Sequence, residues 1–197
     1  MAQHEGTGVD SIRIRDLSAV DLNSIRPLLD AALGTGFWDA DDLACEVALV
    51  AEADGALIGA GTAGLDRTDD GMVGHIRLVA VDPTWRRRGV ATALVRELVG
   101  RCEALGVTSH LTYAWVHGAD GTAPMAGVLA ESGFSLSQRI EGFYSGVVDA
   151  SCPACGQAPC VCPADLYLRE ATPARSQQAL QLDALTVAHN GDRTAHK

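Results

Sequence analysis

The sequence of 197 residues lacks any apolar run near the roughly 20 residues that a membrane-spanning helix requires. Its first ten residues, MAQHEGTGVD, also lack the charged and then apolar segments of a secretory signal peptide. We therefore expect a cytoplasmic protein with no membrane partner.

Positive charge is scarce as well. Lys197 is the sole lysine, and 15 basic residues stand against 25 acidic ones, which gives a formal net charge of −10. A nucleic-acid-binding protein needs a basic face to neutralise phosphates, so we expect no nucleic-acid partner. The excess of Asp over Glu fits a surface adapted to high salt, and GC-rich codon usage explains it equally well.

Hydrophobic residues, by contrast, make up 47% of the chain, which is enough for the core of one domain. We expect this domain to span residues 11–171, with 151–163 as an insertion. Residues 1–10 are predicted to be a flexible tail. Residues 172–197 are predicted to be a second tail, in which 179–187 (ALQLDALTV) either form an amphipathic helix or stay loose.

Hydrophobic periodicity predicts a mixed order of strands and helices. The alternation at residues 12–17 is typical of a strand, and a one-sided apolar pattern indicates a helix from Ser18 to Gly34. Asp54-Gly55 marks a tight hairpin. The other predicted elements are short helices at 39–46 and 123–131, strands at 46–53, 56–65, 72–81, 108–116, 134–144 and 165–170, a loop at 66–71, and a helix that ends near Leu105. This order predicts an α/β fold with a mixed sheet and helices packed on it.

Residues 85–98, WRRRGVATALVREL, place three arginines before a glycine and an apolar helix. Cations oppose the positive end of a helix dipole, so the arrangement is favourable where an anion binds. The unpaired N–H groups of a helix start, here from Arg87 to Thr92, bind phosphates well, and Gly89 allows close approach. A solvated basic cluster before an ordinary core helix is the alternative.

The order of elements, with VAVDPTWRRRGVATAL between the third strand and the main helix, resembles the GNAT acyltransferase superfamily. That family's signature for the pyrophosphate of coenzyme A is Arg or Gln, two residues, Gly, one residue, then Gly or Ala. Arg86, Gly89 and Ala91 fit it. The resemblance implies a mostly antiparallel mixed sheet flanked by helices, acetyl-CoA as cosubstrate, and an amine acceptor.

The resemblance also implies how acetyl-CoA lies in the site. Its pyrophosphate would meet the start of the helix, at residues Arg86, Arg87, Arg88, Gly89, Val90, Ala91 and Thr92. The third strand would part from its neighbour, and the pantetheine arm would pair with backbone groups at Val79, Ala80 and Val81. One such N–H would polarise the thioester carbonyl.

Acetyl transfer to an amine requires a group that accepts a proton. The family often places a glutamate on the third strand, whereas this sequence has GHIRL there. His75 is therefore the first candidate base, because imidazole titrates near neutral pH. Glu141 and Asp120 are weaker candidates.

The general acid is not evident from the sequence. The family commonly has a tyrosine four residues before Gly-Phe, and Leu129 stands at that position. Tyr144 and Tyr113 are substitutes if the fold brings them close. Otherwise water protonates the leaving thiolate, or the chain does not catalyse.

Four cysteines crowd into the segment SCPACGQAPCVCPAD: Cys152, Cys155, Cys160 and Cys162. The Cys-Pro-x-Cys-Gly knuckle and the Cys-x-Cys pair suit a tetrahedral metal site. We expect structural zinc there, with an iron–sulfur or redox role as the alternative. Cys45 and Cys102 lie singly in apolar patterns and are expected to be small buried residues.

Taken alone, the sequence therefore predicts an N-acetyltransferase with a structural zinc knuckle. The acceptor is a small-molecule amine or a protein amine, and a homodimer is left open. A non-catalytic module that senses acyl-CoA or contacts another protein is the alternative.

Overall fold

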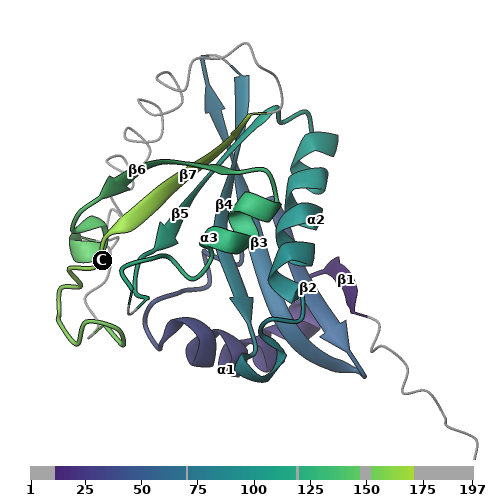
Figure 1. Ribbon diagram of the computed structural model, residues 1–197. Helices are drawn as coiled ribbons and strands as arrows, with labels where there is room; N and C mark the ends of the chain where they lie inside the picture. The colour runs from purple at the N-terminus through teal and green to yellow at the C-terminus, as the bar shows by residue number, and fades with distance from the viewer. Residues whose placement is uncertain (1–11, 70, 119, 147–151, 171–197) are drawn as a thin grey trace, which may run out of the picture.

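The computed structural model describes residues 12–69, 71–118, 120–146 and 152–170 (Figure 1). The two predicted tails, including the segment at 179–187 that was expected either to form a helix or to stay loose, lie outside these residues.

A seven-stranded sheet forms the centre of the molecule, in the order β1-β2-β3-β4-β5-β7-β6. The pair β4 and β5 is parallel, and the other neighbouring strands are antiparallel. This arrangement confirms the mixed, mostly antiparallel sheet. The strands are β1 (Arg13–Asp16), β2 (Val47–Ala53), β3 (Ala56–Thr68), β4 (Gly71–Val81), β5 (Ser109–Trp115), β6 (Ser135–Ile140) and β7 (Ala164–Glu170).

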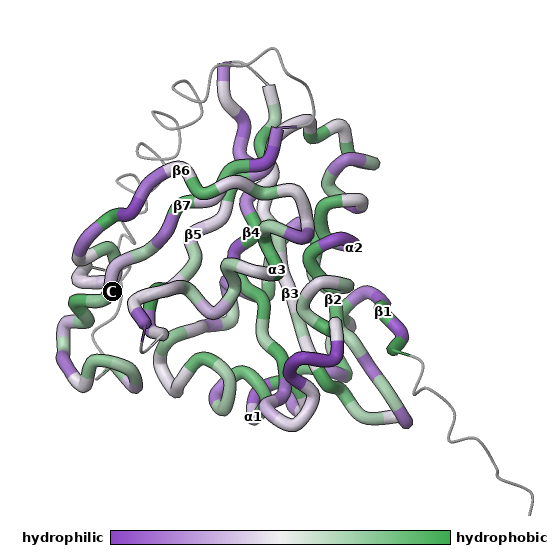
Figure 2. The backbone as a smooth tube through the Cα atoms, viewed as in Figure 1, coloured by the Kyte–Doolittle hydropathy of each residue, from purple (hydrophilic) through white to green (hydrophobic). Residues whose placement is uncertain are grey.

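Helices cover both faces of the sheet. Helix α1 (Leu22–Leu33) packs on one face, through Ile25, Leu28 and Leu29. Helix α2 (Val90–Ala104) packs on the other face, and α3 (Ala126–Glu131) lies beside it (Figure 1). Figure 2 shows hydrophobic residues along much of the central strands that these helices cover. The predicted one-sided apolar pattern of α1 is confirmed.

Three predicted elements are wrong in part. Residues 39–46 make turns instead of a helix, although Asp39 and Asp42 each accept a hydrogen bond from the other's backbone N–H, at 3.2 and 2.9 Å. The predicted loop at 66–71 is mostly strand, because β3 runs to Thr68 and β4 begins at Gly71. The predicted strand at 134–144 ends at Ile140, and a 3-10 turn over Phe143–Gly146 follows.

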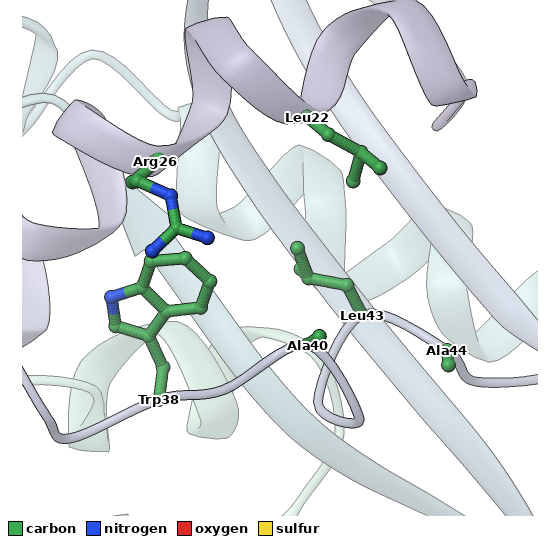
Figure 3. A pocket seen from close by; sticks show the side chains of 6 residues that line it. All are labelled: Leu22, Arg26, Trp38, Ala40, Leu43 and Ala44. Atoms are coloured by element: carbon green, nitrogen blue, oxygen red, sulfur yellow. The ribbon is translucent and has the colours of Figure 1, made fainter.

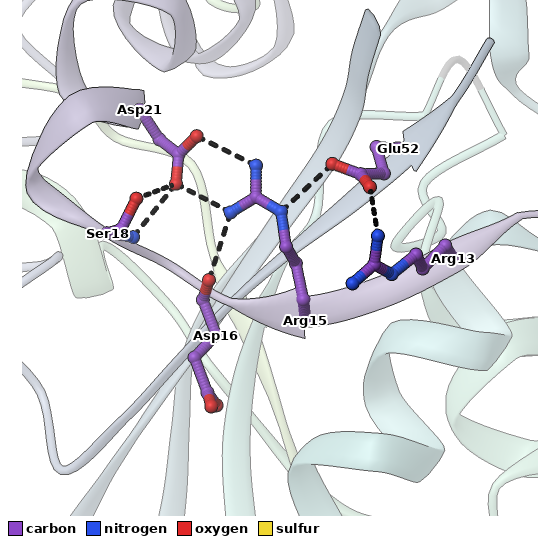
Figure 4. Close-up of polar contacts among 6 residues, drawn as sticks. All are labelled: Arg13, Arg15, Asp16, Ser18, Asp21 and Glu52. Carbon is purple, nitrogen blue, oxygen red and sulfur yellow. Dashed lines mark hydrogen bonds and ion pairs between the residues drawn. The ribbon is translucent and has the colours of Figure 1, made fainter. Parts of the chain in front are cut away.

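An arginine joins the edge strand β1 to the turn that precedes α1 (Figure 4). The guanidinium of Arg15 donates to both carboxylate oxygens of Asp21, at 2.7 and 2.9 Å, and to Glu52 on β2 at 2.9 Å. Asp21 also accepts from the backbone N–H and hydroxyl of Ser18. These contacts hold the pKa of the buried Asp21 well below its ordinary value, with the hydrogen bonds from Arg15 as the main cause.

Among the described residues, no helix is both long and apolar enough to cross a membrane.

Candidate acyl-carrier site and cysteine knuckle

The backbone between β4 and α2 is shaped by two left-handed residues. Asp82 ends β4 and accepts a hydrogen bond from Thr84 N–H at 2.8 Å, which closes a short 3-10 turn. Arg87 and Gly89 then have φ values of +61° and +81°. An ideal Cβ at Gly89 would meet no atom within 4 Å, so the space in front of this residue is open.

Helix α2 begins directly after Gly89. Its first internally bonded amide is that of Ala93, which donates to Gly89 O at 2.9 Å. The amides of Val90, Ala91 and Thr92 come earlier in the helix and have no acceptor within it. Since Val90 is 1% exposed, its side chain anchors the first turn in the core. The helix start is thus fixed in place while its N–H groups remain available to an anion.

The three arginines differ in their surroundings. Arg86 Nε donates to the carbonyl of Val81 at 3.4 Å, so this side chain turns back along the end of β4. The guanidinium of Arg88 lies 4.8 Å from the ring centroid of Trp85. All three are exposed residues. None of the three forms an ion pair with a described carboxylate, so their charges are not neutralised near the helix start.

Strands β4 and β5 part in the middle of the sheet. Their parallel pairing covers Val73 to Ile76 on β4 and ends opposite Thr112. The hydroxyl of Thr112 donates to Ile76 O at 2.9 Å and closes the paired section. Beyond it, residues 77–81 of β4 have no partner on β5, although β5 continues to Trp115 and stays paired with β7 along its other edge. The predicted contact residues Val79, Ala80 and Val81 lie on this section, which pairs with β3 on one side only.

His75 is the next-to-last residue of β4 that pairs with β5, and its side chain is 14% exposed. Its Nδ1 atom lies 3.6 Å from Oδ2 of Asp66 on β3. Its ring meets the edge of Tyr113 on β5, with 5.6 Å between centroids. Asp66 is not among the predicted site residues, because it stands in a polar run that the sequence pattern predicts to be a loop.

Glu141 and Tyr144 occupy different surroundings from His75. Glu141 is exposed in the turn after β6, whereas Tyr144 packs against the cysteine cluster. Burial raises the pKa of Tyr144, and Cys160 and Cys162 raise it further. Phe143 connects the two regions, since its ring stacks on Tyr113 at 4.6 Å and touches Tyr144 at 5.0 Å. Where the family commonly has tyrosine, Leu129 is 2% exposed and fills the core.

The four clustered cysteines come together as the spacing predicts. Their Sγ atoms all lie within 4.8 Å of one another, with 3.8 Å between Cys152 and Cys162 and 4.0 Å between Cys155 and Cys160. Zinc–sulfur bonds of ~2.3 Å place the sulfurs of a tetrahedral site about 3.8 Å apart. These separations are too long for disulfides and fit a single tetrahedral ion.

Backbone N–H groups support the knuckle. Cys155 N–H donates to Cys152 Sγ at 3.4 Å, and Gly156 N–H donates to Cys152 O at 2.8 Å. Hydrogen bonds from the backbone of Val161 and Gln157 lower the pKa of the Cys155 thiol, which favours a thiolate. Burial raises the pKa of Cys160. The donor set is therefore typical of a metal-binding knuckle.

The knuckle packs between the end of α1 and the end of β5. Phe37, after α1, stacks on Trp115 of β5 with 5.4 Å between ring centroids. A Cβ at Gly34 would come within 2.9 Å of Pro153 in the knuckle. Trp115 also touches the ring of His117 at 4.2 Å. The sequence did not point to His117, whose pKa is lowered by desolvation of its ring and by nearby Arg86.

A separate hollow of about 280 Å³ lies between α1 and the turns that follow it (Figure 3). The guanidinium of Arg26 lies 5.0 Å from the ring centroid of Trp38, whose indole N–H donates to Asp30 at 2.9 Å. None of the predicted site residues lines this hollow, which is formed by Leu22, Arg26, Trp38, Ala40, Leu43 and Ala44.

Comparisons with known proteins agree with this geometry. The model of the Acetyltransferase (GNAT) family matches residues 14–133. No curated protein matches the chain in sequence. The IAA acetyltransferase from Bacillus cereus ATCC 14579 is similar in structure, with 16% identity, a TM-score of 0.65 and coverage of 81% of this chain and 99% of its own.

Two further solved structures are similar. The ribosomal-protein-S18-alanine N-acetyltransferase from Escherichia coli has 16% identity, a TM-score of 0.62 and coverage of 85% of this chain and 98% of its own. Arabidopsis thaliana Naa50 in complex with the bisubstrate analogue CoA-Ac-MVNAL has 14% identity, a TM-score of 0.62 and coverage of 81% and 99%. At these identities the likeness supports the fold.

Proposed function

Because the chain belongs to the GNAT acetyltransferase family, we propose that it moves the acetyl group of acetyl-CoA to an amine. The observation that carries the proposal is the start of α2. There, left-handed Gly89, free helical amides and three unpaired arginines form a site for a diphosphate.

The parting of β4 and β5 supplies the second half of the proposed site. Residues 77–81 have no partner on β5, so this edge of β4 would leave room for the pantetheine arm and offer backbone groups that can bind it. An N–H on this section would stabilise the oxyanion that forms when the amine attacks the thioester carbonyl. The C–N bond forms first and gives this oxyanion; the carbonyl then re-forms as the C–S bond breaks, and coenzyme A leaves as the thiolate.

His75 is the proposed base, and it would take the proton that the attacking amine loses. His75 belongs to the last β4 residues that pair with β5, so it lies two residues before the section, 77–81, that we propose to hold the thioester. Glu141 remains the alternative base. Burial keeps Tyr144 protonated, so we propose it as a hydrogen-bond donor on the acceptor side.

We further propose that the knuckle holds one zinc ion through Cys152, Cys155, Cys160 and Cys162. Four thiolates leave no open coordination position, so the ion is assigned a structural role. It would fix the knuckle between the end of α1 and Trp115 of β5, and thereby shape the acceptor side.

Substitutions at Gly89 test the anion site. Asn and Asp both tolerate left-handed backbone, and a Cβ here meets open space, so the two variants differ mainly in charge. We expect Gly89→Asp to bind acetyl-CoA at least about tenfold more weakly than Gly89→Asn, because the carboxylate repels the diphosphate. Titration calorimetry measures both affinities, and equal values would contradict the assignment.

The second candidate function is a non-catalytic acyl-CoA sensor, which the buried Leu129 favours. A panel of amines, including peptide N-termini, lysine and small amines, separates the two functions. Acetylation of any acceptor supports the enzyme. Tight binding of acetyl-CoA without turnover on the whole panel supports the sensor.

A further inference from the structure

Two buried polar atoms, one on His75 and one on Asp66, lie close together in the sheet. Nδ1 of His75 and Oδ2 of Asp66 are both inaccessible to solvent, and neither has a partner within hydrogen-bond distance. A buried polar atom without a partner is costly, so such atoms are rarely left alone. These two atoms lie 3.6 Å from each other.

Strand register explains why they meet. Gly64 pairs with His75 and Asp66 pairs with Val73 across the antiparallel strands β3 and β4. Residues two apart on a strand share a face, so Asp66 and His75 are diagonal neighbours on one face of the sheet. Gly64, directly opposite His75, has no side chain, and the guanidinium of Arg77 lies over it, within 2.8 Å of where a Cβ would be.

The other groups around Asp66 leave this contact undisturbed. The guanidinium of Arg77 lies 4.0 Å from the second oxygen, Oδ1, so the two carboxylate oxygens face different N–H donors. The nearby His75 ring is the main cause that lowers the pKa of Asp66. The carboxylate is therefore ionised at neutral pH and accepts only. The Tyr113 ring adjoins the imidazole from β5.

We propose that Asp66 is a positioning residue that holds His75 in the tautomer with the proton on Nδ1. A carboxylate that accepts from Nδ1–H leaves Nε2 of the neutral ring without a proton and fixes the ring plane. Nε2 is then the atom that takes the proton from the acceptor amine. This inference depends on the proposed acetyl transfer for its catalytic meaning, but the tautomer itself does not.

The test uses nitrogen NMR of the histidine rings, which distinguishes the two tautomers of neutral imidazole, together with steady-state kinetics. At about pH 8.5, where an ordinary imidazole is neutral, His75 of the unaltered protein should carry its proton on Nδ1. Asp66→Asn keeps the shape of the side chain but offers an N–H donor, so the His75 proton should move to Nε2. A His75 proton on Nε2 in the unaltered protein would overturn the proposal.

The kinetic arm uses the same variant. Asp66→Asn should lower kcat by roughly 10- to 100-fold and leave the affinity for acetyl-CoA unchanged, since positioning cannot contribute more than the base it positions. Asp66→Glu, which restores the carboxylate, should recover part of kcat. An unchanged kcat in Asp66→Asn, despite an inverted tautomer, would overturn the catalytic role alone.

Two control variants separate positioning from general effects of charge. Asp69→Asn removes an exposed carboxylate from the same hairpin and should change neither tautomer nor kcat. Arg77→Gln removes the other partner of Asp66 and should keep the Nδ1–H tautomer. If no variant and no acceptor give turnover, the proposed function fails, and the tautomer measurement still decides the contact between Asp66 and His75.

Discussion

At the scale of single residues, His110 shows how burial sets a charge state. This β5 residue is 0% exposed, and its ring lies so close to β4 that a Cβ at Gly74 would come within 2.7 Å of it. Burial, with Arg169 as a smaller cause, lowers the pKa of His110 to about 4. The ring is therefore neutral in the folded protein at pH values where an exposed histidine is protonated.

This shift predicts a loss of stability in mild acid. The pKa is lower in the folded state than the ordinary 6.5, so the unfolded chain binds the extra proton first. The contribution of His110 is fully present above about pH 6.5 and falls by roughly 3 kcal/mol towards pH 4. Urea unfolding across this range measures the slope. In His110→Leu the slope should be flatter, and an unchanged slope would refute the assignment.

The proposed base gives a second prediction at this scale. His75→Ala should lower kcat by roughly 10²-fold, because a general base is lost, and should leave acetyl-CoA affinity nearly intact. Glu141→Gln is the matched comparison and should retain most of the turnover. Steady-state kinetics with the best acceptor measures both. If Glu141→Gln loses the activity and His75→Ala does not, the roles are reversed.

How well the sequence predicted the site depends on how local each feature is. The Arg86 to Thr92 segment and the four cysteines are groups of neighbouring residues, so local spacing was sufficient to propose them as sites. Asp66 lies beside His75 across two strands, and no local spacing brings it to attention. The sequence alone showed that Leu129 stands where the family commonly has a tyrosine. It did not predict that Tyr144 packs against the knuckle.

At the scale of elements, the knuckle gives a prediction about metal. Protein purified without added metal should contain one zinc ion per chain, and Cys155→Ser should lose it, because a tetrahedral site needs all four thiolates. Cleavage within residues 152–162 by a protease should then become faster. Elemental analysis and limited proteolysis provide the measurements.

Cys45→Ser is the control, since Cys45 is half-buried and lies outside the cluster. It should keep the metal. Full metal content in Cys155→Ser would rule out the four-thiolate site, and iron in place of zinc would change the identity of the ion without changing its ligands.

The elements that the sequence missed share a physical reason. Strand β3 continues through Asp66, Arg67 and Thr68 because they pair with β4, and this hairpin projects beyond the helices (Figure 1). A strand without a covered face shows no apolar alternation, so it resembled a loop. Asp39 accepts from the N–H of Asp42 in a turn, but one turn of helix has too few hydrogen bonds to propagate.

At the scale of the whole molecule, the net charge of −10 predicts a dependence on salt. Excess negative charge destabilises a compact state through self-repulsion, and salt screens it. Raising NaCl from about 0.05 to 0.5 M should raise Tm by roughly 2–5 °C, as scanning calorimetry can measure. Near the isoelectric point of about 4.9 the increase should vanish. An equal increase at both pH values would indicate a salt effect unrelated to net charge.

The place of β7 in the sheet has a consequence for synthesis. This strand comes last along the described chain, yet it lies between β5 and β6 and is the sole strand partner of β6. The ribosome therefore releases β6 and the knuckle before the strand that joins them to the sheet exists. Domains generally fold as units, so β6 cannot join the sheet until β7 has been synthesised. A message cut short before residue 164 would yield a chain in which β5 has an open edge and β6 has no strand partner, which is a template for aggregation.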